Sequence, residues 1–421
     1  MRREKNCISR KSLLQVCLAV MVAAALLLTV FPKGKVYAAP KEVKIGMVSP
    51  LTGGAARWGE NSYRAMQLAA EMINEKGGIK SMGGAKVKIV VADTETKPDI
   101  AGIQAEKLIA DKDILVITGS NQSAAGMVAS QVCERKQICY ITGIDQVPMI
   151  TERGFQFTYR TCSIWSTLCR DLIQFAVDMG QKTGKVVQKM AILCEDGIAG
   201  KNASDLLSQY GKEAGFEIVD RSTYHAASTK DFSGYISKYK SAGVDLLAGH
   251  NLFQDGVLIT RTMKELNFNP YGWAVLLGHM VTPEFYETMG KDTNYFTGVT
   301  NSPGVSKKIP KMEQVLARYG TDADPSLIYG FSVVPLVVAT LEKYPTYDRV
   351  AFKHAVDKME VDLGEYNLLQ VDGIKWDSKH DNARARSFII QWHNGVQVPV
   401  APEEYAEAKP VWPRPAWDKL Y

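Results

Sequence analysis

Cysteine and histidine are scarce in this chain of 421 residues, and neither is grouped as a metal site requires. The seven cysteines and six histidines form no Cys-x-x-Cys, His-x-His or His-Glu-x-x-His motif, so we expect no bound metal. Five cysteines follow residue 40, and this odd number cannot pair completely. Because their neighbours are apolar, buried thiols are at least as compatible with the sequence as disulfides. They are Cys133, Cys139, Cys162, Cys169 and Cys194.

Motifs for catalysis and nucleotide binding are also missing. The chain has no Gly-x-Ser-x-Gly, no Walker-type Gly-x-x-x-x-Gly-Lys-Ser/Thr and no Gly-x-Gly-x-x-Gly after a predicted strand, and the glycine-rich segment 53–59 lacks phosphate-binding spacing. Acidic pairs such as Glu195-Asp196 are only sequence neighbours. With no identifiable nucleophile or base, we expect no catalytic residue and no cofactor, and a hydrolase is the weaker hypothesis.

Positive charge is scarce outside the N-terminus. The formal net charge is +5, but the first forty residues hold seven lysines or arginines and one glutamate, so the remainder carries about one negative charge. No later run of basic residues occurs. A near-neutral surface without a basic patch excludes the electrostatic pattern of nucleic-acid or anionic-lipid binding.

Long apolar runs are confined to the N-terminus. A basic segment ends at Lys11, an apolar run of 18 residues covers 13–30, and Val36-Tyr37-Ala38 places small side chains at the signal-peptidase positions. We predict a signal peptide over residues 1–38, cleaved after Ala38, and hence a periplasmic or extracytoplasmic protein. An uncleaved anchor is the alternative, because 18 apolar residues lie at the lower limit for spanning a bilayer.

After residue 40, short apolar strands alternate with amphipathic helices, which indicates an α/β fold with parallel sheets and crossover helices. The expected strands are 43–48, 87–91, 114–117, 139–142, 189–194, 217–222, 245–249, 272–277 and 388–392. The expected helices are 59–75, 98–110, one between Ser123 and the strand at 139–142, 201–214, 232–242, 254–266, 310–319 and 327–341. The proline-containing tail over 409–421 is expected to be an extended strap anchored by Trp412 and Trp417.

Two polar loops follow neighbouring predicted strands, namely Gly119–Ser123 and Gly143–Gln146. Ligands of parallel sheets bind at the carboxyl ends of the strands, where helix N-termini present unpaired N–H groups to anions. Together these loops can hold the polar head of one ligand. Ser120, Asn121 and Ser123 are also good helix caps, and capping alone is the alternative.

A series of motifs begins at Ser49-Pro50-Leu51-Thr52-Gly53. It continues through Gly59, 68–74, Gly77-Gly78-Ile79, 157–161, 231–233, 298–300, 329–331 and 388–392. On these motifs, over residues 43–400, the chain resembles the branched-chain amino acid (Leu/Ile/Val) family of ABC-transporter substrate-binding proteins. The resemblance implies a type I periplasmic binding protein, with two Rossmann-like lobes of parallel sheets joined by a three-crossing hinge. Such lobes close on a ligand in the cleft, and an ABC permease in the membrane recognises the closed form. We expect a monomer.

The resemblance also implies where the lobes begin and end. The crossings are expected near 160–162, 300–303 and 365–370. The segments would be 41–160 and 302–366 for the N-terminal lobe, and 161–301 and 367–421 for the C-terminal lobe.

In the N-terminal lobe, the family's pocket aromatic matches Trp58, which could pack against the ligand or simply lie on the lobe surface. The serine of its carboxylate-binding turn matches Ser123, beside Asn121 and Gln122.

A backbone-and-hydroxyl pair of the family falls on Ile144 and Gln146, so that an amide replaces a threonine hydroxyl. Asp145 between them is a departure from the family. Its carboxylate could repel a ligand carboxylate or, if it points inward, bind an amine or hydroxyl.

The C-terminal lobe departs further from the family. The pocket tyrosine aligns with Ala199, which enlarges the pocket, and the next aromatic falls around Leu252 and Phe253, of which Phe253 could keep the contact. The acid that receives the ammonium of an amino acid aligns near Leu277-Gly278, where no acid exists.

A buried ammonium without a counter-charge is costly. Either Asp145, Glu195 or Asp255 replaces the missing acid from another direction, or the ligand is a carboxylate without an α-amine, such as an aromatic acid. We therefore expect a protein that binds a small amino acid or related carboxylate without altering it. The alternative is a ligand-sensing module that passes a small-molecule signal to a separate membrane receptor.

Overall fold

The computed structural model describes residues 42–226, 228–276, 281–301, 315, 317–318, 325–364 and 372–420, except for the side chains of 325–329. Several predictions lie outside the described residues. These are the signal peptide over 1–38, the site residue Leu277, most of the helix over 310–319, residues 302–303 of the second crossing and the whole third crossing over 365–370.

Five parallel strands form the first sheet, in the order β2-β1-β3-β4-β5. They are β1 (Glu42–Ser49), β2 (Lys86–Asp93), β3 (Ile114–Gly119), β4 (Cys139–Thr142) and β5 (Thr158–Arg160). The crossover helices are α2 (Ala56–Glu75), α3 (Pro98–Ala110) and α4 (Ser123–Lys136). Every residue of β3 is buried, as expected for a central strand of a parallel sheet that is covered on both faces.

The second sheet has the order β14-β13-β10-β9-β8-β6-β7. Its strands are β6 (Lys189–Glu195), β7 (Glu217–Tyr224), β8 (Leu246–Gly249), β9 (Gly272–Leu276), β10 (Thr297–Thr300), β13 (Phe388–His393) and β14 (Val396–Ala401). β6 to β10 pair in parallel, whereas β13 is antiparallel to β10 and β14 is antiparallel to β13. The expectation of parallel sheets is therefore correct for five of these strands and missed the antiparallel edge.

A two-residue turn explains this antiparallel edge. His393 pairs with Val396, and the intervening Asn394 and Gly395 have φ values of 51° and 86°. Positive φ at both central positions is the geometry of the hairpin turn that Asn-Gly favours. The Asn-Gly signal was present in the sequence, but the sequence analysis did not predict β14 from it.

The helices that accompany the second sheet are α5 (Trp165–Thr183), α6 (Ile198–Glu213), α7 (Ser233–Ala242), α8 (Phe253–Glu265) and α9 (Pro283–Met289). The later chain adds α11 (Pro325–Lys343), α12 (Arg349–Asp357) and a small sheet of β11 (Glu360–Val361) and β12 (Ile374–Lys375). Short 3-10 helices are η1 (Lys80–Met82), η2 (Pro148–Ile150), η4 (Gly290–Thr293), η6 (Glu403–Tyr405) and η7 (Trp417–Lys419). Helices α5, α9 and α12 and strands β5, β11 and β12 were not predicted from the sequence.

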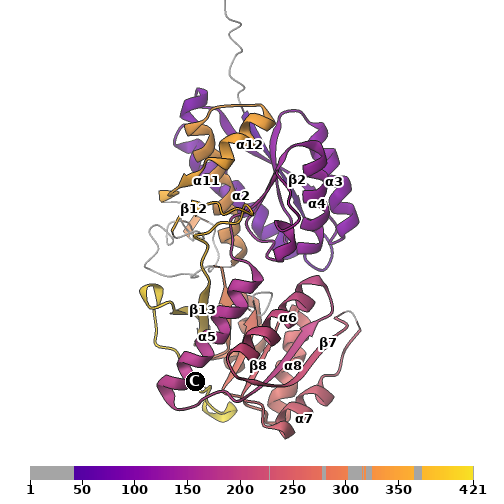
Figure 1. The fold of residues 1–421 in the computed structure, drawn as a ribbon, viewed down its shortest axis with the longest axis vertical. Helices are drawn as coiled ribbons and strands as arrows, with labels where there is room; N and C mark the ends of the chain where they lie inside the picture. Colours follow the sequence, from indigo (N-terminus) through magenta and orange to yellow (C-terminus); the bar gives the residue numbers. More distant parts are fainter. Residues whose placement is uncertain are drawn as a thin grey trace, which may run out of the picture. The chain divides into compact units, whose positions relative to one another are not determined.

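Helix α11 returns to the first sheet and packs against α2 (Figure 1). A Cβ atom added to Gly330 would lie 2.5 Å from the backbone carbon of Ala65, so the glycine permits the close approach of the two helices. The helices that cover the first sheet therefore come from two parts of the chain: α2 precedes β6–β10 of the second sheet in sequence, and α11 follows them.

Each large sheet has apolar clusters on both of its faces. In β6, Met190, Ile192 and Cys194 belong to one cluster and Ala191 and Leu193 to the other. This alternation follows from the period of two along a strand. Because apolar residues cover both faces of each sheet, polar side chains can meet a ligand at the loops that follow the strands.

The C-terminal tail is anchored as predicted. Trp412 and Trp417 are each 7% exposed. Their indole N–H groups donate to the carbonyl oxygens of Lys185 at 3.2 Å and Phe268 at 3.1 Å. The strap therefore fastens the end of the chain to elements of the second sheet.

The cysteines of the described residues are free thiols. All five are buried, and no disulfide joins them. Burial raises the pKa of the Cys133 and Cys162 thiols above the ordinary value. Of the two readings left open by the sequence, the structure supports buried thiols.

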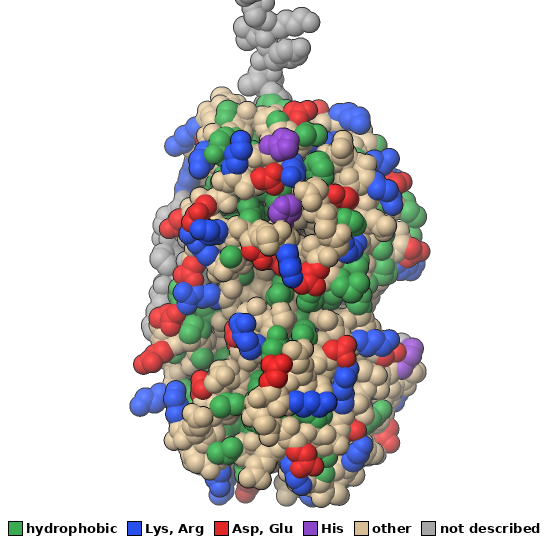
Figure 2. All heavy atoms as spheres, viewed as in Figure 1, with side chains coloured by type: hydrophobic (Ala, Val, Ile, Leu, Met, Phe, Trp, Pro, Cys, Tyr) green, Lys and Arg blue, Asp and Glu red, His purple; other side chains and the backbone are tan. Residues whose placement is uncertain are grey.

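Lysine and arginine are interspersed with aspartate and glutamate on the face shown in Figure 2. No helix in the described part of the chain combines the length and apolar character needed to cross a membrane.

Candidate ligand-binding site

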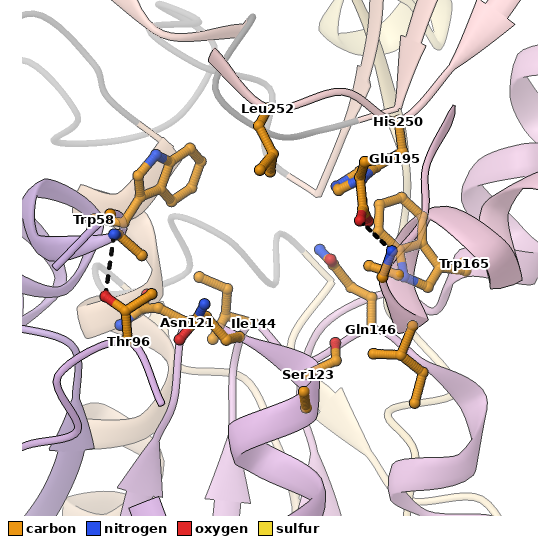
Figure 3. Close-up of a pocket in the computed structure, with 17 residues that line it drawn as sticks. Trp58, Thr96, Asn121, Ser123, Ile144, Gln146, Trp165, Glu195, His250 and Leu252 are labelled. Atoms are coloured by element: carbon orange, nitrogen blue, oxygen red, sulfur yellow. Dashed lines mark hydrogen bonds and ion pairs between the residues drawn. The ribbon is translucent and has the colours of Figure 1, made fainter. Parts of the chain in front are cut away.

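A cavity of about 360 Å³ is lined by loops that follow strands of both large sheets (Figure 3). From the first sheet it takes residues after β1, β2, β3 and β4, and from the second sheet residues after β6 and β8. This is the carboxyl edge of parallel strands, where ligands of α/β folds bind. The volume lies within the range of small-molecule sites. Trp58, after β1, and Leu252, after β8, contribute apolar surface to the cavity (Figure 3).

The loop after β3 brings polar groups to the cavity. The side-chain amide of Asn121 donates to Ser49 Oγ at 2.9 Å and its oxygen accepts from Ser62 Oγ at 2.8 Å. Ser123 is the first residue of α4. The N-cap residue is Gln122, and the start of the helix has no capping hydrogen bond from a side chain. The capping hypothesis is therefore wrong for α4, and the positive end of the helix dipole faces the cavity without a side-chain cap.

Asp145 does not line the cavity but lies behind the loops that do. The Tyr140 hydroxyl donates to its carboxylate at 2.7 Å, and the hydroxyls of Thr142 and Ser120 lie 2.9 and 3.2 Å away. Burial raises the pKa of Asp145 to about 6, although these three hydrogen-bonding groups oppose the shift. The carboxylate joins the loops after β3 and β4, and it does not line the cavity.

Arg160 holds the loop that carries Gln146 through hydrogen bonds to the backbone of the loop. One guanidinium nitrogen donates to the carbonyl oxygens of Asp145 at 3.1 Å and Val147 at 2.7 Å. The backbone carbonyl oxygen of Gln146 accepts the backbone N–H of Trp165 at 3.1 Å. With its backbone fixed in this way, Gln146 points its side chain into the cavity, and its Nε2 has no partner in the described part of the chain (Figure 3).

Glu195 and His250 form the polar part of the wall from the second sheet. Glu195 Oε1 lies 3.4 Å from His250 Nδ1, and the backbone N–H of Glu195 donates to the His250 carbonyl oxygen at 3.0 Å. The carboxylate also accepts the N–H groups of Gly197 and Gly200 at the start of α6. Burial alone would raise the pKa of Glu195, but His250 and these two amides lower it below the ordinary value.

Trp165 completes this part of the wall. Its ring lies edge-on to His250, with centroids 5.2 Å apart and an interplanar angle of 82°. Trp165 is 2% exposed, and its indole nitrogen has no hydrogen-bond partner in the described residues. The ring thus limits the positions that the imidazole can adopt.

Most of the predicted site residues come together in this cavity. Those that line it are Trp58, Asn121, Gln122, Ser123, Ile144, Gln146 and Ala199. Asp145 and Phe253 do not line it. Phe253 packs edge-on to Phe285 with centroids 6.1 Å apart, and the preceding Leu252 takes the place at the cavity.

The three acids considered as replacements differ in position. Asp145 is bonded behind the wall, and Asp255 is buried where its carboxylate accepts the Tyr224 hydroxyl at 3.1 Å, away from the cavity lining. Glu195 alone among them lines the cavity.

The sequence analysis did not select Thr96, Trp165 or His250 as site residues, although all three line the cavity. His250 follows β8 directly and Thr96 lies in the loop after β2, so the rule that ligands bind at strand ends would have found both. Trp165 begins a helix that was not predicted, although Leu168, Leu172, Phe175 and Met179 repeat at helical spacing. Among the described residues, no group of three or more His, Cys, Asp or Glu side chains is arranged to hold a metal ion.

Comparisons with known proteins identify the family. Residues 42–396 match a family model described as periplasmic binding protein. The Leu/Ile/Val-binding protein homolog 7 of Brucella abortus (strain 2308) is 27% identical over 390 residues, which cover 87% of this chain and 93% of that protein.

Solved structures show the same fold. A leucine binding protein from Thermotoga maritima MSB8 superposes with a TM-score of 0.73 at 21% identity, covering 85% of this chain and 98% of that one. A branched-chain amino acid transporter substrate binding protein from Streptococcus pneumoniae, solved in complex with isoleucine, gives a TM-score of 0.71 at 16% identity, covering 88% and 100%.

Proposed function

The chain belongs to the periplasmic binding protein family, and we propose that it binds a small amino acid or related carboxylate outside the cytoplasm and delivers it to an ABC permease. The observation that carries this proposal is the cavity of about 360 Å³ whose wall combines uncapped helix and amide groups of the first sheet with Glu195 and His250 of the second. Relatives named for Leu/Ile/Val binding and a neighbour solved with isoleucine support the ligand class.

The carboxylate of the ligand binds at the start of α4. Ser123 and Ala124 line the cavity there, and no side chain caps the helix, so the first-turn N–H groups and the Ser123 hydroxyl are available to an anion. Gln146 supplies a further donor, since its unpaired amide nitrogen is buried at the same wall. Trp58, Ile144 and Ala199 leave an apolar space for the side chain of the ligand.

Closure of two lobes around a hinge traps the ligand. We place the hinge at the crossings near 160–162, 300–303 and 365–370, between lobes made of 41–160 with 302–366 and 161–301 with 367–421. Arg57 on α2 forms an ion pair with Glu284 on α9, next to the cavity residue Trp58. Because α2 packs in the core of the first sheet and Phe285 in that of the second, this pair links the two lobes.

Export and delivery complete the proposal. Residues 1–38 act as a signal peptide that is removed after Ala38, and the mature protein acts as a monomer in the periplasm or at the cell exterior. The closed form docks on the permease and releases an unaltered ligand.

Calorimetric titration of the purified protein with leucine, isoleucine, valine, phenylalanine and benzoate tests the proposed function. We expect saturable binding of at least one of them to one site, recovery of the ligand unchanged, and at least a tenfold loss of affinity in Ser123→Ala, since a charge-assisted hydrogen bond is lost. Ser81→Ala, at a site remote from the cavity, is the control. Chemical conversion of a bound compound, or no binding of these or of any other small amino acid or carboxylate, would contradict the proposal.

A further inference from the structure

The charges around the cavity are unequal. Among the described residues that line it, Glu195 is the only aspartate or glutamate, and none is a lysine or arginine. The described lining therefore carries the negative charge of Glu195 and no lysine or arginine to balance it. A ligand carboxylate without an amine would bring a second negative charge into this space, whereas an amino acid brings its own positive group.

Glu195 is held so that its negative charge stays at the wall. Its two oxygens accept the N–H groups of Gly197 and Gly200, the second at 2.7 Å, at the positive end of the α6 dipole. A Cβ atom at Gly200 would lie 2.1 Å from the carbonyl oxygen of Glu195, so only glycine permits this approach of helix and acid. An ionised carboxylate can accept about four hydrogen bonds, which leaves capacity for a ligand.

His250 provides a second polar group beside this acid. Its Nδ1 is buried 3.4 Å from Glu195 Oε1, so an Nδ1–H faces the carboxylate and leaves Nε2 as the acceptor nitrogen of a neutral ring. The edge-on ring of Trp165 and the backbone bond from Glu195 to the His250 carbonyl fix the imidazole next to the carboxylate.

We infer that Glu195 and His250 together hold the amine of the ligand and make the cavity select α-amino acids over the same acids without the amine. The inference rests on the proposed function and names its ligand class. Asp145 and Asp255 cannot take this part, because neither lines the cavity and each carboxylate is directed at a tyrosine hydroxyl instead.

The two polar groups on the Cα atom of an amino acid would contact different walls of the cavity. Ser123, at the start of α4, lies on the wall from the first sheet, and Glu195 and His250 lie on the wall from the second (Figure 3). A zwitterion therefore bridges the two sheets, whereas a carboxylate without an amine contacts the polar groups of only one.

Paired ligands that differ only in the amine test the inference. The probes are leucine with 4-methylpentanoate and phenylalanine with 3-phenylpropanoate, titrated by calorimetry into the wild-type protein. We expect the amino acid of at least one pair to bind at least about tenfold more tightly than its partner. In Glu195→Gln this ratio should fall to about threefold or less, through weaker binding of the amino acid alone.

Asp196→Asn is the matched control, because it removes the same charge from the adjacent residue, which does not line the cavity. Its ratio should equal that of the wild type. His250→Gln is the second test variant, since Glu195→Gln also weakens the start of α6; it should reduce the ratio while circular dichroism and thermal unfolding report a folded protein.

The outcomes separate the inference from the proposed function. If the wild type binds the acids without an amine as tightly as the amino acids, or if Glu195→Gln and His250→Gln both keep the wild-type ratio, the inference is wrong and the proposed function stands. If the wild type binds neither member of either pair, nor any other small amino acid or carboxylate, both are wrong.

Discussion

Arg160 and Asp381 form a buried ion pair that joins the last strand of the first sheet to the segment that precedes β13. Arg160 Nε and Nη2 donate to the two carboxylate oxygens of Asp381 at 2.9 and 3.0 Å. Arg160 is fully buried, and its remaining nitrogen holds the carbonyl oxygens on either side of Gln146. The ion pair thus stabilises the contact between β5 and the segment before β13, and it also fixes the backbone around the cavity residue Gln146.

Replacing Asp381 by asparagine should lower the free energy of unfolding by about 3 kcal/mol or more, because it leaves the buried guanidinium without a counter-charge. Urea denaturation measures the change. Glu152→Gln is the control, since Glu152 pairs with Lys379 at the surface, with side chains 39% and 54% exposed. That pair should contribute less than about 1 kcal/mol. Equal effects of the two substitutions would contradict the prediction.

Asp145 should make stability depend on pH in an unusual direction. Its pKa is raised by burial from 3.8 to about 6, so the folded protein binds the proton more tightly than the unfolded chain. The resulting stabilisation is fully present below pH 3.8 and is lost as the pH rises through about 6, by about 3 kcal/mol in total.

Urea denaturation of the wild type and of Asp145→Asn between pH 4 and 7 measures this contribution. Relative to the variant, the wild type should lose stability as the pH rises across this range. A difference between the two proteins that stays constant with pH would show that Asp145 does not titrate in this way.

Gly200→Ala should destabilise the protein although alanine favours helices. The added Cβ would lie 2.1 Å from the Glu195 carbonyl oxygen and 2.7 Å from its Oε1, so the start of α6 must move, at a cost of about 1–3 kcal/mol. Gly234→Ala in α7 meets no atom within 4 Å and should stabilise by roughly 0.5–1 kcal/mol. Thermal unfolding of both variants should therefore shift in opposite directions.

The ion pair of Arg57 with Glu284 should contribute modestly to ligand affinity by favouring closure. The side chain of Arg57 is 67% exposed, so removing the pair by Glu284→Gln should weaken binding by about fivefold at most, with a smaller effect at high salt. Glu287→Gln, an exposed residue of the same helix, is the control. Titration of a tight ligand at two ionic strengths tests this; an effect that does not change with salt would exclude a screened surface pair.

Much of the fold could be predicted because its signals are local. The helix over 98–110 and the strand over 139–142 agree with α3 and β4 at every residue, since capping, periodicity and apolar runs are properties of neighbouring positions. The predicted strand-end loops likewise carry Asn121, Ser123 and Gln146 to one cavity, because the carboxyl ends of parallel strands share one edge.

Side-chain direction could not be predicted in the same way. Asp145 lies between two cavity residues in sequence, yet its carboxylate turns inward to Tyr140 and lies against Gly126, where a Cβ would lie 2.4 Å from it. Leu252 rather than Phe253 reaches the cavity, because Phe253 packs on Phe285. These outcomes depend on partners that are distant in sequence.

By itself, the sequence determined the alternation of strands and helices, the polar loops at the strand ends and the resemblance to a solute-binding family. Only the tertiary structure decided which of three candidate acids lines the cavity, and it placed Glu195 there beside His250. The physical reason is that periodicity and turn chemistry act between near neighbours, whereas the position of a charge in a cavity depends on the packing of separate strands and helices.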